Sequence, residues 1–342
     1  MLIKRKLFQG LGYRPERATS VLRLECTPRI HFEKLSDYSK SESVEIIDPR
    51  NNRLTGHYFQ ERSAHLLRNV ILEPRQGLIY SSDGELICES TCWSPHQAYS
   101  SFPWNPRVNI PPLALSSAIY ITSNSYWHWL IEDLASTIFS LSLAAESPIL
   151  VAENPPRYVA DFLATTGRDV IFLKGPVQVE SLIMIEKSHD SGWPHVKDIL
   201  ELQNYSPFKK VRQEKQPRIR LYVSRRGSRR SPKNESKVES LFQSYNFVIH
   251  KLEDLDLLNE IKVLSDVYLL AGIHGAGFAN QIWMPAGGVI LDIVDENYWT
   301  ESIHRLATLN QHKYEFLPYD GAGNGEVPLA QLEVKIQEIT SL

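Results

Sequence analysis

The chain of 342 residues has few cysteines and no long apolar run. Its three cysteines, Cys26, Cys88 and Cys92, are odd in number, and their spacing matches no zinc site and no disulfide framework. No run of about eighteen apolar residues is present, so no transmembrane helix is predicted. The N-terminal stretch MLIKRKLFQGLGYRPER lacks the continuous apolar core of a signal peptide. These absences predict a soluble protein of the reducing cytoplasm, with peripheral association at the inner face of the membrane left open.

The net charge is also small, −3 at pH 7, which argues against a nucleic-acid-binding protein. The cations are unevenly distributed along the chain, however. Between Lys209 and Lys233 there are eleven Lys or Arg residues against one acid, Glu214, so this window carries about +10 and the rest of the chain about −13. A local cationic site on an acidic protein suits a small polyanionic ligand better than a long one.

The length and the order of the segments predict the fold class. Residues 1–112 are expected to form a β-rich extension, in which residues 70–90 have the pattern of a hairpin. From Ala114 onward, strand-like and helix-like segments alternate, which indicates βαβ crossovers and parallel sheets. The fold class is therefore α/β, and two Rossmann-like domains are expected at 113–205 and 206–342.

The expected elements of these two domains follow from apolar periodicity. In the first domain, strands are expected at 118–123, 149–153, 169–175 and 181–187, and helices at 125–146 and 155–167. In the second, strands are expected at 218–224, 247–252, 267–273 and 289–294, and helices from Pro232 and at 257–264. The Pro-rich segment 94–112 is interpreted as a linker or a covering loop.

Two motifs directly follow strands of the second domain. The first is a cluster of arginines, Arg225, Arg226, Arg229 and Arg230, and the second is His274-Gly275-Ala276-Gly277. A guanidinium matches two phosphate oxygens, and each such charge-assisted hydrogen bond contributes roughly 1.5–3 kcal/mol. Glycines at a helix start let an anion reach free N–H groups. Because ligands bind at the carboxyl ends of parallel strands, the motifs predict a nucleoside diphosphate site. The alternatives are a solvated basic loop and tight strand-to-helix packing.

A third motif lies in the expected helix at 125–146. His128 and Glu132 are four residues apart and share one helix face, so they are candidates for a general-base pair; a surface ion pair is the alternative. Asp133 points about a quarter-turn away and is a weaker candidate. Further along, Asp254-Leu255-Asp256 has the D-x-D form that can hold a metal beside a sugar nucleotide. It immediately precedes an apolar-periodic helix, so helix capping is the favoured interpretation.

Taken together, these residues resemble glycosyltransferase family 61, which includes bacterial polysaccharide-biosynthesis enzymes, plant xylan transferases and animal O-linked GlcNAc transferases. The resemblance extends from about Ala114 to Asp295. Its motifs are H-W-L-I-E at His128–Glu132, Ser224-Arg225, Arg230 with Asn234-Glu235, His274–Gly277 with Asn280, and Asp292, where many members carry Glu.

The resemblance implies a GT-B-like fold, with two Rossmann-like domains facing a cleft, and an inverting, metal-independent transfer. The donor would be a nucleotide sugar, UDP-linked, and the acceptor a glycan or glycolipid in polysaccharide biosynthesis. The domain at 113–205 would lie on the acceptor side and the domain at 206–342 would bind the donor. The implied catalytic residues are Glu132 as the base and His128, which would orient or replace it; Asp133 is added to them from the helix spacing as the weaker candidate. The implied donor-binding residues are Ser224, Arg225, Arg230, Asn234, Glu235, His274, Gly275, Ala276, Gly277, Asn280 and Asp292.

Two other functions are alternatives to this one. A non-catalytic partner subunit would retain the same fold and the nucleotide pocket. A nicotinamide-dependent oxidoreductase is disfavoured, because Asn280 stands where the third glycine of G-x-G-x-x-G would be. No metal ion or other cofactor is expected, only the nucleotide-sugar co-substrate.

Overall fold

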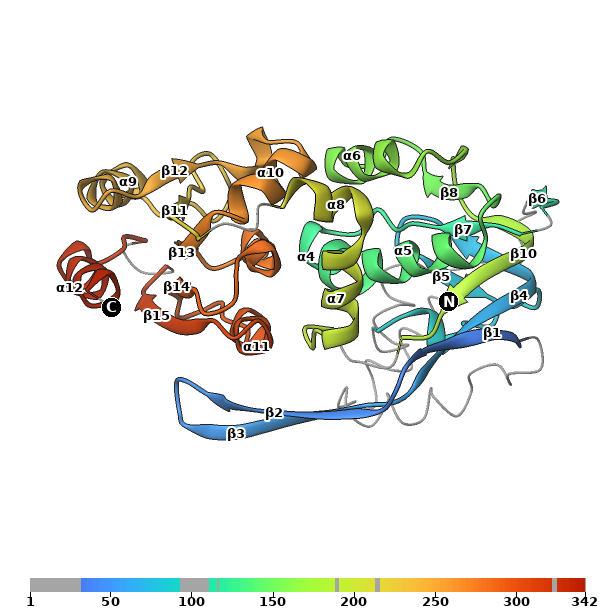
Figure 1. The fold of residues 1–342 in the computed structure, drawn as a ribbon, viewed down its shortest axis with the longest axis horizontal. Coiled ribbons are helices and arrows are strands. Elements are labelled where there is room, and N and C mark those ends of the chain that lie inside the picture. The colour runs from blue at the N-terminus through green and yellow to red at the C-terminus, as the bar shows by residue number, and fades with distance from the viewer. Residues whose placement is uncertain are drawn as a thin grey trace, which may run out of the picture. The chain divides into compact units, whose positions relative to one another are not determined.

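The computed structural model describes residues 32–92, 111–115, 117–187, 191–212, 216–321 and 325–341 (Figure 1). The chain divides into two compact units. Unit 1 contains the described residues up to Glu45 and those of Gly56–Ser191, and unit 2 contains Ile46–Thr55 and the residues from Gly192 onward. Most of the Pro-rich segment expected as a linker lies outside the described residues.

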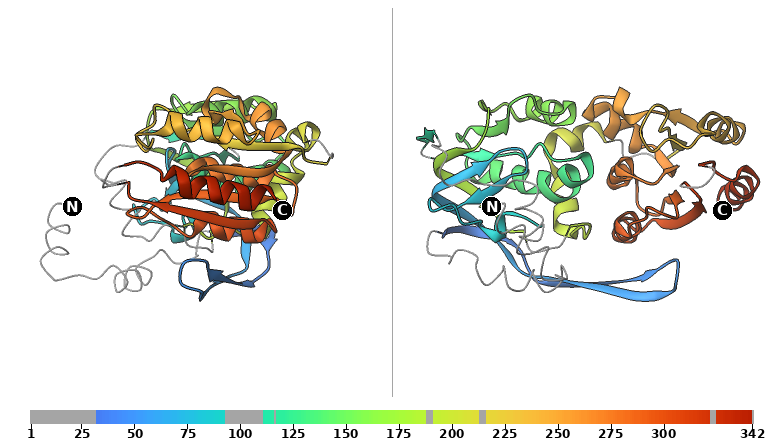
Figure 2. Two further views of the ribbon diagram at one scale, coloured as in Figure 1. Left: turned by 90° about the vertical axis from the view of Figure 1, so that its left-hand side faces the viewer. Right: turned by 180° about the vertical axis from the view of Figure 1, so that it is seen from behind.

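Unit 1 contains a mixed sheet and a short parallel sheet. The mixed sheet has the order β1-β4-β10-β6, with β5 paired to β4, and the parallel sheet has the order β7-β8-β9. The strands are β1 (Phe32–Ser39), β4 (Arg62–Glu73), β5 (Leu78–Tyr80), β6 (Pro112–Leu113), β7 (Ile119–Tyr120), β8 (Ile149–Ala152), β9 (Val170–Leu173) and β10 (Val177–Ile185). In addition, β2 (Glu42–Asp48) and β3 (Arg53–Phe59) pair as a two-stranded ribbon, drawn in blue in Figure 2.

The helices of unit 1 include the one that carries the H-W-L-I-E motif. They are η2 (Cys88–Ser90), α4 (Tyr126–His128), η3 (Trp129–Asp133), α5 (Leu134–Leu143) and α6 (Arg157–Thr166). The single helix expected at 125–146 is therefore present, but η3 is a π-helical turn inside it. Such turns insert one extra residue and are frequent at functional sites. Glu132 and Asp133 both lie in this turn.

Unit 2 is a doubly wound parallel sheet with the order β12-β11-β13-β14-β15. Figure 1 shows α9 and α12 on one face of this sheet and α10 and α11 on the other. Its elements are α7 (Val196–Asn204), α8 (Ser206–Val211), β11 (Ile219–Val223), α9 (Glu235–Ser244), β12 (Val248–His250), η4 (Leu252–Asp254), α10 (Leu257–Leu264), β13 (Val267–Ile273), η5 (Ala276–Trp283), β14 (Val289–Asp295), α11 (Ser302–Leu309), β15 (Lys313–Tyr319) and α12 (Leu329–Thr340).

Local sequence explains how unit 2 forms. Val238 and Phe242 of α9 and Ile336 of α12 are fully buried, and they join the core on their face of the sheet. Asp256 caps α10, because its Oδ1 accepts a hydrogen bond from Asn259 N at 2.9 Å. The capping interpretation of the D-x-D segment is therefore confirmed for Asp256. The strand order reverses between β11 and β13, and open α/β sheets bind ligands at such a switch point.

The mixed α/β fold is confirmed, but two Rossmann-like domains are not. The strand expected at 181–187 as part of a parallel sheet belongs to β10, which pairs antiparallel with β4. Residues 62–73 of the β-rich segment and residues 177–185 therefore share one sheet. Period-2 alternation indicates a strand but does not say which strand it pairs with, and this is why the sequence pattern missed the pairing.

Two further expectations concern the cysteines and the membrane. Cys88 is disulfide-bonded, although the cysteine spacing matches no disulfide framework; Cys92 is free. The inference of a reducing compartment rested on the cysteine pattern, and a disulfide is typical of oxidising compartments.

In the part of the chain that the structure describes, no helix has the length and apolar character needed to cross a membrane.

Candidate functional sites

The first candidate site lies at the carboxyl ends of β11 and β13 in unit 2. Arg225 follows β11, and its backbone N–H donates to Glu235 Oε1 at 2.8 Å. The same Glu235 oxygen accepts from Tyr222 OH at 3.2 Å. Burial raises the pKa of Glu235. This buried carboxyl group at the start of α9 fixes the backbone from which the Arg225 side chain extends.

The Arg225 side chain reaches the glycine motif on the neighbouring strand. A Cβ atom added to Gly275 would lie 2.7 Å from Arg225 Cζ and would overlap the guanidinium. Only glycine therefore lets the guanidinium take this position against the backbone. The two motifs that the sequence predicts at one edge of the sheet are thus brought together at the switch point between β11 and β13.

The other arginines of the cluster differ in their surroundings. Arg226 forms an ion pair with Glu239, and Arg229 is exposed. By contrast, neither Arg225 nor Arg230 has a side-chain hydrogen bond or ion pair within the described residues, and Arg230 Nη1 is buried. Burial, and then the charge of Arg230, lower the pKa of Arg225. Two neighbouring, partly buried cations repel each other, and a bound anion would offset this repulsion.

His274 lies beside this pair and is itself held by a carboxylate. Its Nδ1 is 2.8 Å from Asp292 Oδ2, and the same oxygen accepts from Tyr314 OH at 2.8 Å. His274 Nε2 is 3.4 Å from Thr300 Oγ1. Asp292 is fully buried. It therefore lies behind His274, and its bond to Nδ1 fixes the plane of the imidazole ring.

Three other residues expected at the donor site hold its loops in place. Asn234 donates to Val327 O at 2.8 Å and accepts from Val327 N at 2.9 Å. Asn280 is fully buried, donates to Glu260 Oε1 at 2.5 Å and accepts from Trp283 Nε1 at 3.2 Å. Ser224 Oγ donates to Glu239 Oε1 at 2.6 Å. These side-chain atoms stabilise the loops around Arg225 and His274.

The second candidate site is in unit 1, at the π-helical turn. The spacing of His128 and Glu132 predicts a contact, and His128 Nδ1 is indeed 2.8 Å from Glu132 Oε2. Cys92 Sγ donates to Glu132 Oε2 at 3.1 Å, and Ser191 Oγ donates to Glu132 Oε1 at 3.1 Å. A carboxylate that accepts hydrogen bonds from several donors is favoured in its ionised form.

The two members of this pair differ in access to solvent. The side chain of Glu132 is 1% exposed and that of His128 is 30% exposed. Burial alone would lower the pKa of His128, but the hydrogen bond to Glu132 and its charge raise it above the ordinary value. Burial, and then the charge of Glu132, raise the pKa of the Cys92 thiol well above its ordinary value, so the thiol is a neutral donor.

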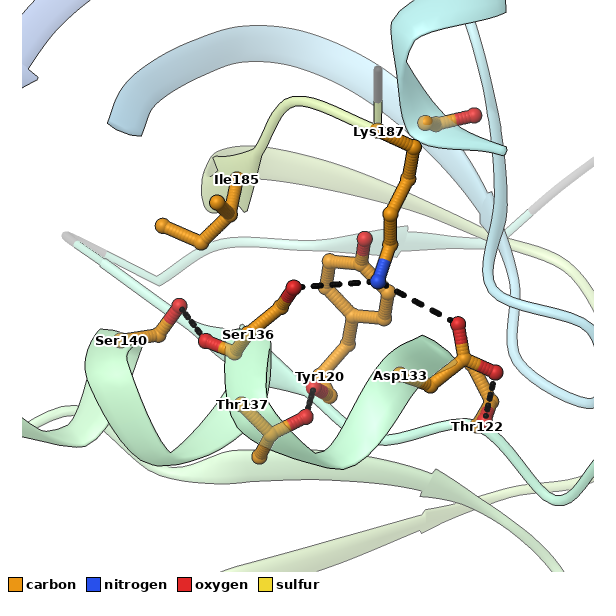
Figure 3. Close-up of a pocket in the computed structure, with 9 residues that line it drawn as sticks. Tyr120, Thr122, Asp133, Ser136, Thr137, Ser140, Ile185 and Lys187 are labelled. Atoms are coloured by element: carbon orange, nitrogen blue, oxygen red, sulfur yellow. Dashed lines mark hydrogen bonds and ion pairs between the residues drawn. The ribbon is translucent and has the colours of Figure 1, made fainter. Parts of the chain in front are cut away.

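Asp133 takes part in a separate buried cluster, shown in Figure 3. Lys187 is 3% exposed; it lies 3.4 Å from Asp133 Oδ1 and donates to the backbone carbonyl of Glu132. Asp133 Oδ2 accepts from Thr122 Oγ1 at 2.9 Å. Burial raises the pKa of Asp133, and Lys187 opposes this. The adjoining cavity of about 10 Å³ has space for about one water molecule.

A comparison with known families gives one match, which includes residues of both candidate sites. Residues 126–291 match the family described as Glycosyltransferase 61. The match includes the His128–Glu132 pair, the arginine cluster and the glycine motif. This region belongs to glycosyltransferase family 61. The match supports a glycosyltransferase activity for the protein. No curated protein matches the chain.

The sequence did not single out several residues of the two candidate sites. Cys92 was considered only for zinc and disulfides, and Lys187 and Ser191 lie in a polar passage after β10. Tyr298 and Tyr314 follow β14 in the chain without a recognisable motif. One signal was available: Lys187 lies two residues after the buried strand β10, where a cation is unusual unless it is paired.

Proposed function

We propose that this protein is an inverting, metal-independent glycosyltransferase that moves a sugar from a UDP-linked donor to a hydroxyl group of a glycan or glycolipid in polysaccharide biosynthesis. The observation that carries the proposal is the close approach of Arg225 to Gly275. It joins two anion-binding features at the switch point of a doubly wound sheet, where such folds bind their ligands.

The donor diphosphate would lie against unit 2. Arg225 and Arg230 would neutralise its charge, and the first N–H groups of η5, at Ala276 and Gly277, would add hydrogen bonds. His274 would donate from Nε2 to an oxygen of the diphosphate. As the bond between the anomeric carbon and the phosphate oxygen breaks, negative charge grows on that oxygen. Donors already fixed in place stabilise this charge, so that no metal ion is required in the proposal.

The remaining expected donor residues would support these groups from behind. In this assignment Glu235 and Ser224 position the backbone around Arg225, and Asp292 orients His274. Asn234 and Asn280 anchor the loops. We therefore assign direct contact with the diphosphate to Arg225, Arg230, His274 and the η5 backbone.

We assign the role of general base to His128, with Glu132 as its partner. Glu132 is buried and its oxygens already accept from Cys92 and Ser191, whereas His128 is partly exposed. With Nδ1 donating to the carboxylate, the lone pair is on Nε2, where it can accept the proton of the acceptor hydroxyl. Glu132 stabilises the imidazolium that forms.

In the proposed step, the acceptor hydroxyl gives its proton to His128 Nε2 and its oxygen bonds to the anomeric carbon. The bond from that carbon to the diphosphate breaks, and the electron pair leaves with UDP. Attack from the face opposite the leaving group inverts the configuration. The proposal includes a GT-B organisation, with the donor bound by unit 2 and the base supplied by unit 1.

Binding of UDP to the full chain tests the donor site. Arg225→Ala should raise the Kd for UDP about 10- to 150-fold in calorimetry, the loss of one charge-assisted hydrogen bond or more. The matched control is Arg229→Ala, which removes an exposed cation from the same cluster and should leave the Kd unchanged. If Arg225→Ala, Arg229→Ala and the unmodified protein bind UDP with the same Kd, Arg225 is not part of the donor site.

Release of UDP from a panel of UDP-sugars, with and without glycan acceptors, tests the activity. A transferase releases UDP faster when a suitable acceptor is present. A protein that binds UDP tightly but releases none from any donor would be the non-catalytic partner subunit instead. Retention of full activity after treatment with a chelator is expected.

A further inference from the structure

Tyr298 is an exposed aromatic residue directly beside the candidate donor site. It follows β14 and is 47% exposed. The Arg230 guanidinium lies over its ring, with Cζ 4.4 Å from the ring centroid. The ring of His274 meets it edge-on, with the centroids 5.9 Å apart and the planes at 69°. A single side chain thus contacts both Arg230 and His274.

The Arg230–Tyr298 contact leaves the charge of Arg230 uncancelled. A carboxylate would hold the guanidinium equally well, but it would neutralise the charge and occupy its N–H groups. An aromatic ring attracts the cation through its face and leaves the N–H groups in the guanidinium plane available. Arg230 has no carboxylate partner within the described residues, and its Nη1 lacks a hydrogen-bond partner there.

The backbone around Tyr298 is fixed by a turn. Tyr298 N donates to Asp295 O at 2.9 Å, and Asn297 N donates to the side chain of Asp295 at 2.9 Å. Side-chain bonds of this kind define an Asx turn. The turn begins at the last residue of β14, so the ring is carried by a short, hydrogen-bonded link to the central sheet and can act as a fixed surface for Arg230.

We propose that Tyr298 is a positioning residue of the donor site, which holds Arg230 beside His274 with its charge and donors free for the diphosphate. The inference rests on the proposed function and adds to it a residue outside the motifs of the sequence. The ring, rather than the hydroxyl group, carries the role. Tyr298 therefore affects binding of the diphosphate through Arg230.

Calorimetric titration of the full chain with UDP, and with inorganic pyrophosphate, tests this role. Tyr298→Leu should raise the Kd for both ligands about 3- to 30-fold, the range expected for one cation–π contact. Tyr298→Phe retains the ring and should bind as the unmodified protein does. Tyr268→Leu is the matched control, because Tyr268 also contacts an arginine, Arg220, but near the amino-terminal end of β13.

A double-variant comparison separates positioning from a general structural effect. In the Arg230→Ala background, Tyr298→Leu should change the Kd by less than about twofold, because the residue on which it acts is already absent. Multiplicative effects of the two changes would overturn the proposal, as would wild-type affinity in Tyr298→Leu. If Arg225→Ala and Arg230→Ala both bind UDP normally, the proposed function fails instead, and this inference with it.

Discussion

His274 and Asp292 form a buried pair across two neighbouring strands, with His274 Nδ1 2.8 Å from Asp292 Oδ2. Asp292 is the pairing partner of Gly272 on β13, and His274 lies two residues beyond Gly272. Residues two apart in a strand point to the same face, so this diagonal contact follows directly from the strand register. In unit 1 the pair His128–Glu132 repeats the arrangement on a helix.

Replacement of Asp292 should lower the stability of the protein. Asp292→Ala leaves Tyr314 OH and His274 Nδ1 without their acceptor and should lower the free energy of unfolding by about 2–4 kcal/mol. Urea denaturation measures this loss. Asp292→Asn retains one acceptor oxygen and should lose less than half as much. Equal losses in the two variants would contradict the proposed role of the shared oxygen.

Replacement of Glu132 should affect turnover and leave donor binding intact. Glu132→Gln removes the charge that stabilises the imidazolium of His128, so kcat should fall about 10²- to 10⁴-fold. The Kd for UDP should stay the same, since the proposed diphosphate site is formed by residues of unit 2. The matched control is Glu201→Gln, which removes a carboxylate from another i,i+4 pair, with Lys197. Near-normal kcat in Glu132→Gln would exclude Glu132 from the mechanism.

The pH dependence of kcat should report the pKa of His128. The base acts in its neutral form, and Glu132 raises the pKa of His128, so activity should be lost as pH falls through a value above about 6.5. In Glu132→Gln the effect of burial and the charge of Asp133 remain, but the charge of Glu132, which raises the pKa of His128, is gone. The acidic limb of the residual activity should therefore move to lower pH than in the unmodified protein. An acidic limb that does not move would contradict the assignment of His128 as base.

The raised pKa of His128 also affects stability, and this effect depends on pH in the opposite direction to kcat. The pKa of His128 is raised in the folded protein, so its pairing contributes fully below the pKa of the unfolded chain and is lost as pH rises through the raised folded value. Stability from this pair is thus greatest where the base is protonated and inactive. A urea-denaturation series across pH 5–9, compared with Glu132→Gln, measures the contribution.

Sequence periodicity predicted the parallel strands β11, β12, β13 and β14 of unit 2 and the positions of the two motifs that follow β11 and β13. Long apolar strands that alternate with amphipathic helices have few arrangements available, because parallel crossovers are right-handed. Once the strands are predicted to be parallel, the residues that follow them are expected at one edge of the sheet. Arg225 and Gly275, which follow β11 and β13, are therefore expected to lie close together. The helix spacing likewise predicted the contact between His128 and Glu132, which is confirmed.

The features that the sequence did not reveal depend on contacts between distant residues. β10 and β4 are about 110 residues apart along the chain, and nothing in their alternation specifies the pairing. Cys92 reaches Glu132 across forty positions. The π-helical turn has no recognisable sequence pattern. Its Glu132 carbonyl accepts a hydrogen bond from Lys187, which lies in a distant segment of the chain. Contacts of this kind are set by packing, and a local pattern does not encode them.

Lys187 provides the last prediction, because it links stability to the geometry of the base. Its ammonium group is buried between Asp133 and the carbonyl of Glu132. Lys187→Met leaves the Asp133 carboxylate without its charged partner and should lower the free energy of unfolding by about 3–5 kcal/mol. Loss of the donor to the Glu132 carbonyl should also shift the turn, and with it the carboxylate that holds His128.

A second substitution separates the two effects of Lys187. Lys187→Met with Asp133→Asn removes both charges and should recover most of the lost stability, since an uncharged amide is less costly to bury. The Glu132 carbonyl remains without its donor, so kcat should stay about 10- to 100-fold low while the Kd for UDP is unchanged. Recovery of kcat together with stability would show that Lys187 only balances Asp133. A kcat that stays low in a stable protein would show that Lys187 holds the turn in the geometry that the base requires.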